Sequence, residues 1–112
     1  MKTLTYEEFD RVDIRSGTIL KVEEFTRAQK TAFKIWADFC SDVGVLQTSA
    51  QVTVHYTPQS LIGKQIMGCV NLGEKNIAGF KSQFLLLGCG DDNGAICLLT
   101  VNPTVPNGQK MY

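Results

Sequence analysis

A long alternation of apolar and polar side chains near the start of the chain constrains the fold more than any other sequence feature. This period of two predicts a half-buried β-strand. Its mainly apolar face would carry Val12, Ile14, Thr18, Leu20 and Val22, and its charged face Asp13, Arg15, Lys21 and Glu23. Gly17 lies near the middle, where a missing side chain permits a bulge or bend. Such a strand can contribute to both sides of a small barrel.

Capping and turn signals divide the rest of the chain into short elements. Thr5 and Glu8 form a capping-box pair that predicts a short helix within residues 4–11. Thr57, Pro58 and Gly63 mark the beginning and end of a second short helix. Further strands are predicted at 33–39, 43–50, 65–72, 84–87 and 96–100, with turns at 41–42, 73–76 and 91–94. The strand at 84–87 is continuously apolar and is expected to be buried on both faces.

This order of elements is typical of an all-β fold, a five-stranded barrel of the oligonucleotide-binding (OB) type with a short N-terminal helix and extra C-terminal strands. Periodicity alone also admits another small barrel. The length of 112 residues and the 44% hydrophobic content predict a single domain over 1–112. The chain starts without a signal-peptide pattern and has no apolar run of about twenty residues, the length of a membrane helix. We therefore expect a cytoplasmic protein without membrane insertion.

The reactive side chains form no pattern that indicates catalysis. His55 is the single histidine, and a structural or surface role is its stronger interpretation. The four cysteines, Cys40, Cys69, Cys89 and Cys97, lack the CxxC or Cys/His spacing of a zinc site and are expected to be reduced and buried. The sequence therefore predicts a binding module rather than an enzyme, with no catalytic residue, metal or cofactor.

Positive charge is concentrated in two stretches, although eleven basic and eleven acidic residues cancel over the whole chain. The first stretch covers the loop between the first two predicted strands, and the second adjoins the connection between the fourth and fifth. OB barrels bind oligonucleotides with these loops, so a binding role competes here with scattered surface lysines. The basic residues are Arg27, Lys30 and Lys34 in the first stretch and Lys75 and Lys81 in the second.

Aromatic platforms would strengthen the case for nucleic acid, because unpaired bases stack on Phe, Tyr and Trp. Phe33 and Phe39 fall on the inward phase of their strand and are expected in the core. Trp36 falls on the opposite phase. A partner subunit or the N-terminal helix is a better candidate to cover it than a base.

Five short motifs follow one another along nearly the whole chain: Val12-Asp13-Ile14-Arg15-Ser16-Gly17-Thr18-Ile19, Ser49-Ala50-Gln51, Val70-Asn71-Leu72, Ile77-Ala78-Gly79-Phe80-Lys81-Ser82 and Val105-Pro106-Asn107-Gly108. In this order and spacing they resemble the CsaA-like tRNA-binding domains. The chain is also similar to the C-terminal appendage of bacterial methionyl-tRNA synthetase and to the endothelial monocyte-activating polypeptide module. It departs from the pattern at residues 74–76, Glu-Lys-Asn, where relatives often have two basic residues.

The resemblance implies an OB fold, a homodimer built with the terminal segments, structure-dependent tRNA binding and a chaperone activity linked to protein export. It also implies a nucleic-acid face on which lysines neutralise phosphates and amide or hydroxyl groups bind phosphate, sugar or base edges. Together with Lys75 of the second basic stretch, the members of this face are Lys30, Lys34, Gln47, Ser49, Asn71, Lys81 and Ser82.

A chaperone would hold unfolded or pre-export polypeptides with exposed apolar surface. The candidates are Trp36, Phe84, Met111 and Tyr112, and a dimer seam would use the same residues. The sequence therefore leaves a second function open, a peptide-binding molecular chaperone with little physiological RNA binding.

Overall fold

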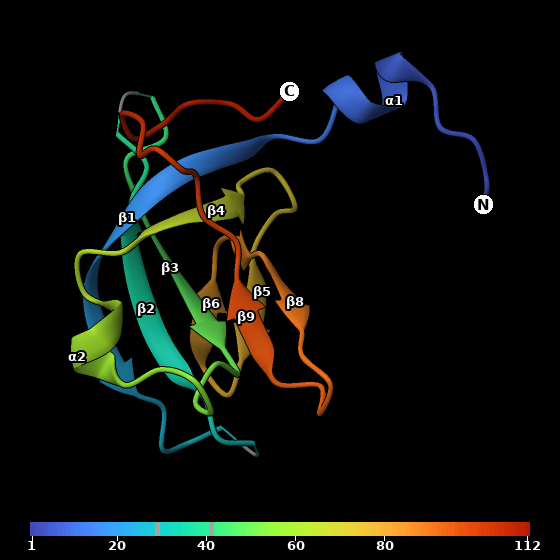
Figure 1. The fold of residues 1–112 in the computed structure, drawn as a ribbon. Coiled ribbons are helices and arrows are strands. Elements are labelled where there is room, and N and C mark those ends of the chain that lie inside the picture. The colour runs from blue at the N-terminus through green and yellow to red at the C-terminus, as the bar shows by residue number, and fades with distance from the viewer. Residues whose placement is uncertain (29, 41) are drawn as a thin grey trace.

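A computed structural model describes residues 1–28, 30–40 and 42–112 and contains two short helices and nine strands in that described part of the chain (Figure 1). In chain order these are α1 (Tyr6–Asp10), β1 (Ile14–Glu24), β2 (Phe33–Asp38), β3 (Val45–Ala50), α2 (Pro58–Leu61), β4 (Gln65–Cys69), β5 (Lys75–Ile77), β6 (Phe80–Ser82), β7 (Leu85–Leu86), β8 (Gly88–Gly90) and β9 (Ile96–Leu98). The predicted turn at 41–42 includes Ser41, which lies outside the described residues.

Five antiparallel strands in the order β3-β2-β1-β4-β7 form a nearly closed barrel. The gap between β3 and the segment before β7 is bridged by several hydrogen bonds, two of which end on backbone carbonyls. The Gln83 backbone N–H donates to the Gln47 carbonyl at 2.8 Å, and the Thr48 hydroxyl donates to the Phe84 carbonyl at 2.7 Å. The predicted OB-type barrel with additional C-terminal strands is therefore confirmed, with β8 and β9 as a separate hairpin.

β1 serves both sides of the barrel, as its length and alternation predict. Residues 14–18 pair with β4, and residues 18–24 pair with β2. The bulge lies between Ile19 and Lys21, however, and not at Gly17. It shifts the phase of the strand, so Ile19 is 1% exposed and Leu20 is 50% exposed. The predicted inward position of Leu20 is therefore wrong.

Gly17 in β1 is required because an aromatic ring packs directly against its backbone. A Cβ on Gly17 would lie 2.8 Å from the ring of Phe39, and a Cβ on Gly68 in β4 would lie 2.8 Å from the ring of Phe84 and 2.9 Å from that of Phe39. The two rings pack edge to face with their centroids 4.9 Å apart. Bare backbone on both strands thus makes room for an aromatic pair at the centre of the barrel.

The core consists of the inward side chains of the strands and one residue of α2. β2 alternates between buried and half-buried residues, and Phe33 and Phe39 are in the core as predicted. Thr57 caps α2 and Pro58 opens it, as the sequence indicates, and its Leu61 is fully buried. The buried cluster is Ile19, Phe33, Ile35, Ala37, Phe39, Val52, Leu61, Ile66 and Phe84.

The connection between β4 and β7 differs most from the prediction. Residues 75–77 are not a turn; they form β5, which pairs with β6 in a hairpin that the sequence did not indicate. Its turn residues Ala78 and Gly79 both have positive φ, 50° and 84°, as the tightest two-residue hairpin turns require. The apolar segment 84–87 is not buried on both faces, because β7 has two residues and Leu85 is 52% exposed.

The C-terminal segment lies along the first half of β1 (Figure 1). Ser16 is fully buried beneath it, where its hydroxyl donates to the Pro106 carbonyl at 2.9 Å and accepts from the Gln109 N–H at 3.0 Å. The backbone of Ser16 also exchanges hydrogen bonds with Gly108 and Gln109. We define residues 105–111 as the C-terminal strap.

The N-terminal helix projects away from the barrel (Figure 1) and buries none of its residues. The predicted capping box of Thr5 and Glu8 is present. In the described part of the chain, neither helix has the length and apolar character of a membrane span. Of the four cysteines only Cys69 is buried, so the expectation of four buried thiols is wrong.

Candidate nucleic-acid interface

An open cleft of about 790 Å³ lies where the end of β3 meets two loops of the barrel. Lys30 in the β1–β2 loop lines one side, and Ile77 and Ala78 at the tip of the β5–β6 hairpin line another. Residues 49–52 and 85–88 complete the lining together with Ile96. The β1–β2 loop and the connection after β4 are the loops with which OB barrels bind oligonucleotides.

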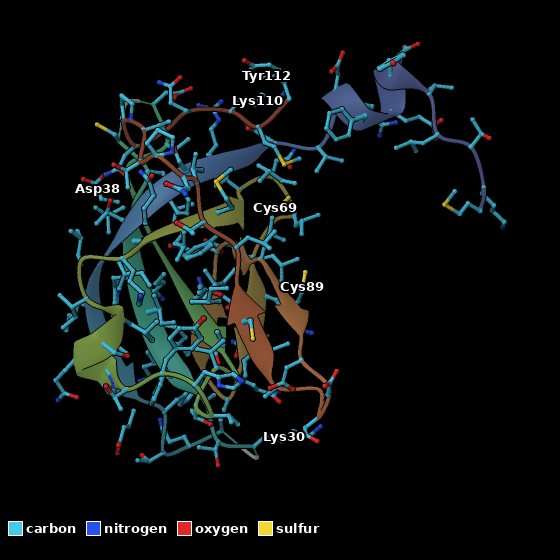
Figure 2. All side chains as sticks on the ribbon, viewed as in Figure 1. Lys30, Asp38, Cys69, Cys89, Lys110 and Tyr112 are labelled. Carbon is cyan, nitrogen blue, oxygen red and sulfur yellow. The ribbon has the colours of Figure 1, made fainter. Side chains whose placement is uncertain are left out.

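Four of the predicted residues carry positive charge, and one of them, Lys30, lines this cleft. Lys30 is exposed in the β1–β2 loop, which Figure 2 shows at the lower end of the barrel. Lys34 pairs with Ser49 across β2 and β3, and Lys75 and Lys81 are exposed on the β5–β6 hairpin. Among the described residues, no carboxylate forms an ion pair with any of these four lysines. Their charge is therefore available to a polyanion.

An aromatic cluster supports one of these lysines. The ring of Phe80 packs edge to face against Phe25 and Trp36, with centroid separations of 5.5 and 5.8 Å. The Lys34 ammonium lies 4.9 Å from the Phe25 centroid and 5.0 Å from that of Phe80, within the range at which aromatic rings attract a cation. Phe80, together with Lys21 on the other side, covers Trp36; α1 does not. Phe25 and Phe80 also belong to this face, although no sequence pattern indicated them.

Two predicted RNA contacts instead hold the β5–β6 hairpin against β3. The Gln47 side chain accepts from the Trp36 indole N–H at 3.1 Å and donates to the Lys81 carbonyl at 2.9 Å. Ser82 is 8% exposed, and its hydroxyl accepts from the Ser49 N–H at 2.8 Å. The polar groups of both side chains are occupied within the chain, so we assign them a structural role in positioning the hairpin.

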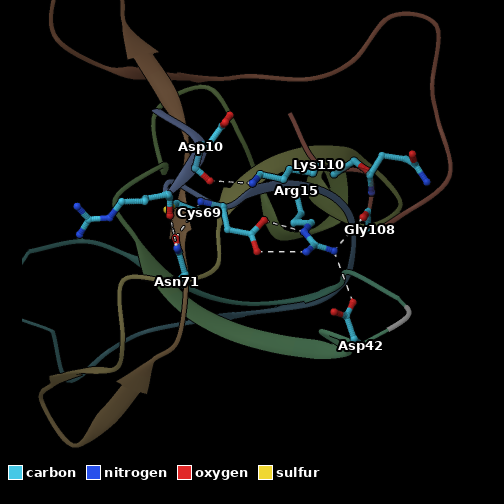
Figure 3. A network of polar contacts seen from close by, with 11 residues as sticks. Asp10, Arg15, Asp42, Cys69, Asn71, Gly108 and Lys110 are labelled. Atoms are coloured by element: carbon cyan, nitrogen blue, oxygen red, sulfur yellow. Dashed lines mark hydrogen bonds and ion pairs between the residues drawn. The ribbon is translucent and has the colours of Figure 1, made fainter. Parts of the chain in front are cut away.

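Asn71 also has its polar groups occupied, in the network of Figure 3. Its side chain accepts from the Asp13 N–H at 3.0 Å and donates to the Arg11 carbonyl at 2.7 Å, which fixes the segment before β1. Arg15 binds both oxygens of Asp13, at 2.7 and 3.2 Å. The hydrogen bond with Asp13, aided by the more distant Asp42, raises the pKa of Arg15 above its ordinary value. This network therefore positions the segment before β1, and the RNA contact expected of the exposed Asn71 stays a prediction.

The apolar candidates occupy three different environments. Phe84 is 4% exposed and belongs to the core, so its prediction as exposed peptide-binding or dimer surface is wrong. Trp36 is half-buried beside Phe80, and Met111 is half-buried in the strap, where its N–H donates to the Ile14 carbonyl. Tyr112 at the chain end is fully exposed.

His55 takes no part in lining the cleft. Its Nε2 lies 2.6 Å from the Asp91 carboxylate in the β8–β9 turn. This hydrogen bond, with further ones from the N–H groups of Asn93 and Ala95, lowers the pKa of Asp91 below its ordinary value.

The family model described as "Putative tRNA binding domain" matches residues 14–110, which include the whole barrel, the cleft and nearly all of the strap. The chain belongs to this family of tRNA-binding domains. The matched segment begins after α1.

Solved structures of similar length share the fold. The chain is similar to the crystal structure of chaperone CsaA from Bacillus anthracis str. Ames, with 40% identity, a TM-score of 0.92 and coverage of 99% of this chain and 100% of that one. The CsaA chaperone protein of Picrophilus torridus is 37% identical over 98% of this chain and 100% of its own, with a TM-score of 0.91.

Longer relatives contain the same tRNA-binding domain as one part. The methionine–tRNA ligase of Chlorobium chlorochromatii is 31% identical over 110 residues, 96% of this chain. The chain spans only 15% of the length of that ligase. The likeness therefore concerns a small part of that ligase.

Proposed function

We propose that this chain binds folded tRNA in the cleft, as a homodimer in the cytoplasm, and contributes binding rather than catalysis. The observation that carries the proposal is a set of four lysines without ion-pair partners among the described residues. Lys30 lines the cleft, and the other three lie on β2 and on the β5–β6 hairpin. Membership in a family of tRNA-binding domains supports tRNA as the ligand.

The geometry separates two kinds of contact. Lysines on flexible stems neutralise phosphates without reading sequence, so they fix where the RNA backbone lies. The half-buried rings of Trp36 and Phe80 offer apolar surface next to the Lys34 ammonium. An unstacked base placed there would contribute about 1–3 kcal/mol by stacking. The combination favours a folded RNA with an exposed loop or end over a regular duplex.

The proposed homodimer is supported by the N-terminal helix. α1 buries no residue in its own chain, although Leu4 is 58% and Tyr6 is 90% exposed. A short helix with exposed apolar side chains is stabilised mainly by packing against another surface. The ends of a second copy are a suitable surface, because Tyr112 presents a further exposed ring there.

Filter binding with folded tRNA at low salt tests the proposed RNA function. We expect Lys34→Ala and Lys81→Ala each to weaken binding severalfold, because each removes one phosphate contact. Lys64→Ala is the matched control, since Lys64 is an exposed lysine between α2 and β4 and belongs to neither basic stretch. Absence of binding at low salt, or equal losses in all three variants, would contradict the proposal.

The lining of the cleft favours peptide binding as a second candidate function. Several of its members are aliphatic, among them Val52, Leu85 and Ile96, and Leu85 is half exposed. An extended, unfolded segment could bury its side chains there, and the similar structures from B. anthracis and P. torridus are named as CsaA chaperones. A chaperone acting on pre-export polypeptides with little physiological RNA binding would use this surface.

Suppression of the aggregation of an unfolded client tests the chaperone candidate. We expect Leu85→Asp to abolish the suppression at near-stoichiometric levels, because it places a charge in the apolar lining. Leu99→Asp changes an exposed leucine outside the lining and should retain it. If the wild-type protein protects none of several clients, or if Leu85→Asp protects as well as wild type, this function is excluded.

A further inference from the structure

Three potential metal ligands from separate parts of the sequence meet beside the β8–β9 hairpin. They are His55 in the loop before α2, Asp91 in the β8–β9 turn and Cys97 in β9. One ligand atom of each lies within 4.8 Å of the others. No local pattern in the sequence indicates this site, because the residues lie 36 and 6 positions apart and show no zinc-type spacing.

The separations are close to those of a tetrahedral zinc site. Bonds of about 2.0–2.3 Å from the metal to nitrogen, oxygen and sulfur place the ligand atoms roughly 3.3–3.7 Å from one another. The three ligand atoms lie within 4.8 Å of one another, so binding requires them to approach by about 1 Å, which side-chain rotation can supply. The His55–Asp91 contact of 2.6 Å would open slightly as the metal replaced the shared proton.

The scaffold already orients two of these ligands. One oxygen of Asp91 accepts from the N–H groups of Asn93 and Ala95, both at 2.9 Å, which leaves the other oxygen facing His55. The loop that carries His55 is tied to β9, because the Tyr56 hydroxyl accepts from the Leu98 N–H at 2.9 Å. Hydrogen bonds of this kind around a ligand restrict its orientation and raise metal affinity.

Cys89 lies outside this cluster of three and is the candidate for a fourth ligand, on the same hairpin as Cys97. Cys89 lies directly opposite Cys97 in the β8–β9 register, so the two side chains share one face. Directly opposed residues have Cβ atoms about 4.5–5.5 Å apart, and two thiolates bound to one zinc ion fit this spacing. Both thiols are free and exposed.

We propose that His55, Asp91, Cys97 and Cys89 form a binding site for a zinc-class divalent transition metal. Thiolate and imidazole ligands select Zn²⁺ and its relatives over Mg²⁺ and Ca²⁺, which prefer oxygen. All four positions would be filled by protein, which is the arrangement of structural rather than catalytic zinc. The metal would join the loop before α2 to the β8–β9 hairpin, whose Gly88 and Ile96 line the cleft.

Cobalt titration of the reduced, chelator-treated full chain tests the proposal directly, without RNA or a client. We expect saturation at one equivalent, with the visible bands of tetrahedral Co²⁺ and a thiolate-to-metal charge-transfer band that Zn²⁺ abolishes and Mg²⁺ does not. The expected stoichiometry follows from one set of four ligands per chain. Absence of saturable binding would overturn the site.

Variants separate this site from incidental thiol binding. His55→Ala and Cys97→Ser should each weaken the affinity at least about tenfold, as a loss within a metal site usually does. Cys40→Ser, which changes an exposed cysteine outside the cluster, should bind as wild type.

Cys89→Ser should remove about half of the charge-transfer intensity. An unchanged band overturns the assignment of Cys89. Wild-type affinity in Cys97→Ser overturns the whole site. Circular dichroism of the metal-free variants distinguishes loss of a ligand from loss of fold.

Discussion

Residues without large side chains decide how this barrel closes. Gly17 and Gly68 occupy adjacent strands, and each leaves the space that the ring of Phe39 fills. The edge-to-face contact of Phe39 with Phe84 therefore depends on two positions that contribute no side-chain contact of their own. Close-packed interiors tolerate added volume poorly, so these positions are sensitive to the smallest substitution.

Gly68→Ala tests this dependence. The added methyl group would lie within 3.0 Å of both aromatic rings, and we expect a loss of about 1–3 kcal/mol in the free energy of unfolding. Gly90→Ala is the control, because its new Cβ would meet nothing closer than 3.6 Å and should cost much less. Urea denaturation measures both. Equal stability of the two variants would show that the rings move aside.

The charged part of the candidate interface could be predicted from the sequence, and its neutral polar part could not. Lysines avoid burial, so Lys30 and Lys81 are exposed wherever the fold places their loops. An amide or hydroxyl group can face solvent or bind backbone equally well. Gln47, Asn71 and Ser82 bind groups from 33 to 60 positions away, and such contacts leave no local signal.

At the scale of elements, the long alternating strands and the capped helices were predictable because their signals are local. β1 and β2 repeat a period of two over many residues, and Thr57 with Pro58 marks α2 by itself. The β5–β6 hairpin has only three residues in each strand, which is too short for periodicity to be read. It is held by side-chain contacts with β3, and these contacts exist only in the folded barrel.

Ser16 connects one such element, the C-terminal strap, to β1. Ser16→Ala would remove two hydrogen bonds from a fully buried hydroxyl, and we expect a loss of about 1–3 kcal/mol. The N–H groups of Gly108 and Gln109 should then exchange faster with solvent than in wild type. Thr104→Ala, at an exposed position just before the strap, should change neither quantity. Unchanged exchange in Ser16→Ala would show that backbone pairing alone holds the strap.

The helix α1 provides a test of the proposed homodimer. Tyr6→Asp places a charge on the exposed apolar side of the helix, and we expect it to convert a dimer into a monomer. Glu7→Gln, on the same helix, should remain dimeric. Light scattering at several protein concentrations measures the mass. A monomeric wild type, or a dimeric Tyr6→Asp variant, would contradict a dimer built with this helix.

At the scale of the whole molecule, a neutral chain can still attract a polyanion through the separation of its charges. Residues 1–24 contain four basic and six acidic side chains, whereas the two basic stretches around the cleft contain five basic side chains and no acid. The field that an approaching RNA meets therefore depends on its direction. The net charge of zero excludes a general electrostatic attraction to nucleic acid, but it carries no information about this arrangement of charges.

The dependence of tRNA affinity on salt measures how many of these charges act. Each neutralised phosphate contributes about 0.7–0.9 to the slope of log affinity against log salt, so four lysines predict a slope near −3. Lys81→Ala should reduce the magnitude of that slope by about one such step, and Lys64→Ala should leave it unchanged. A slope near zero in wild type would mean that apolar contacts dominate the cleft, and a peptide rather than RNA would then be its natural ligand.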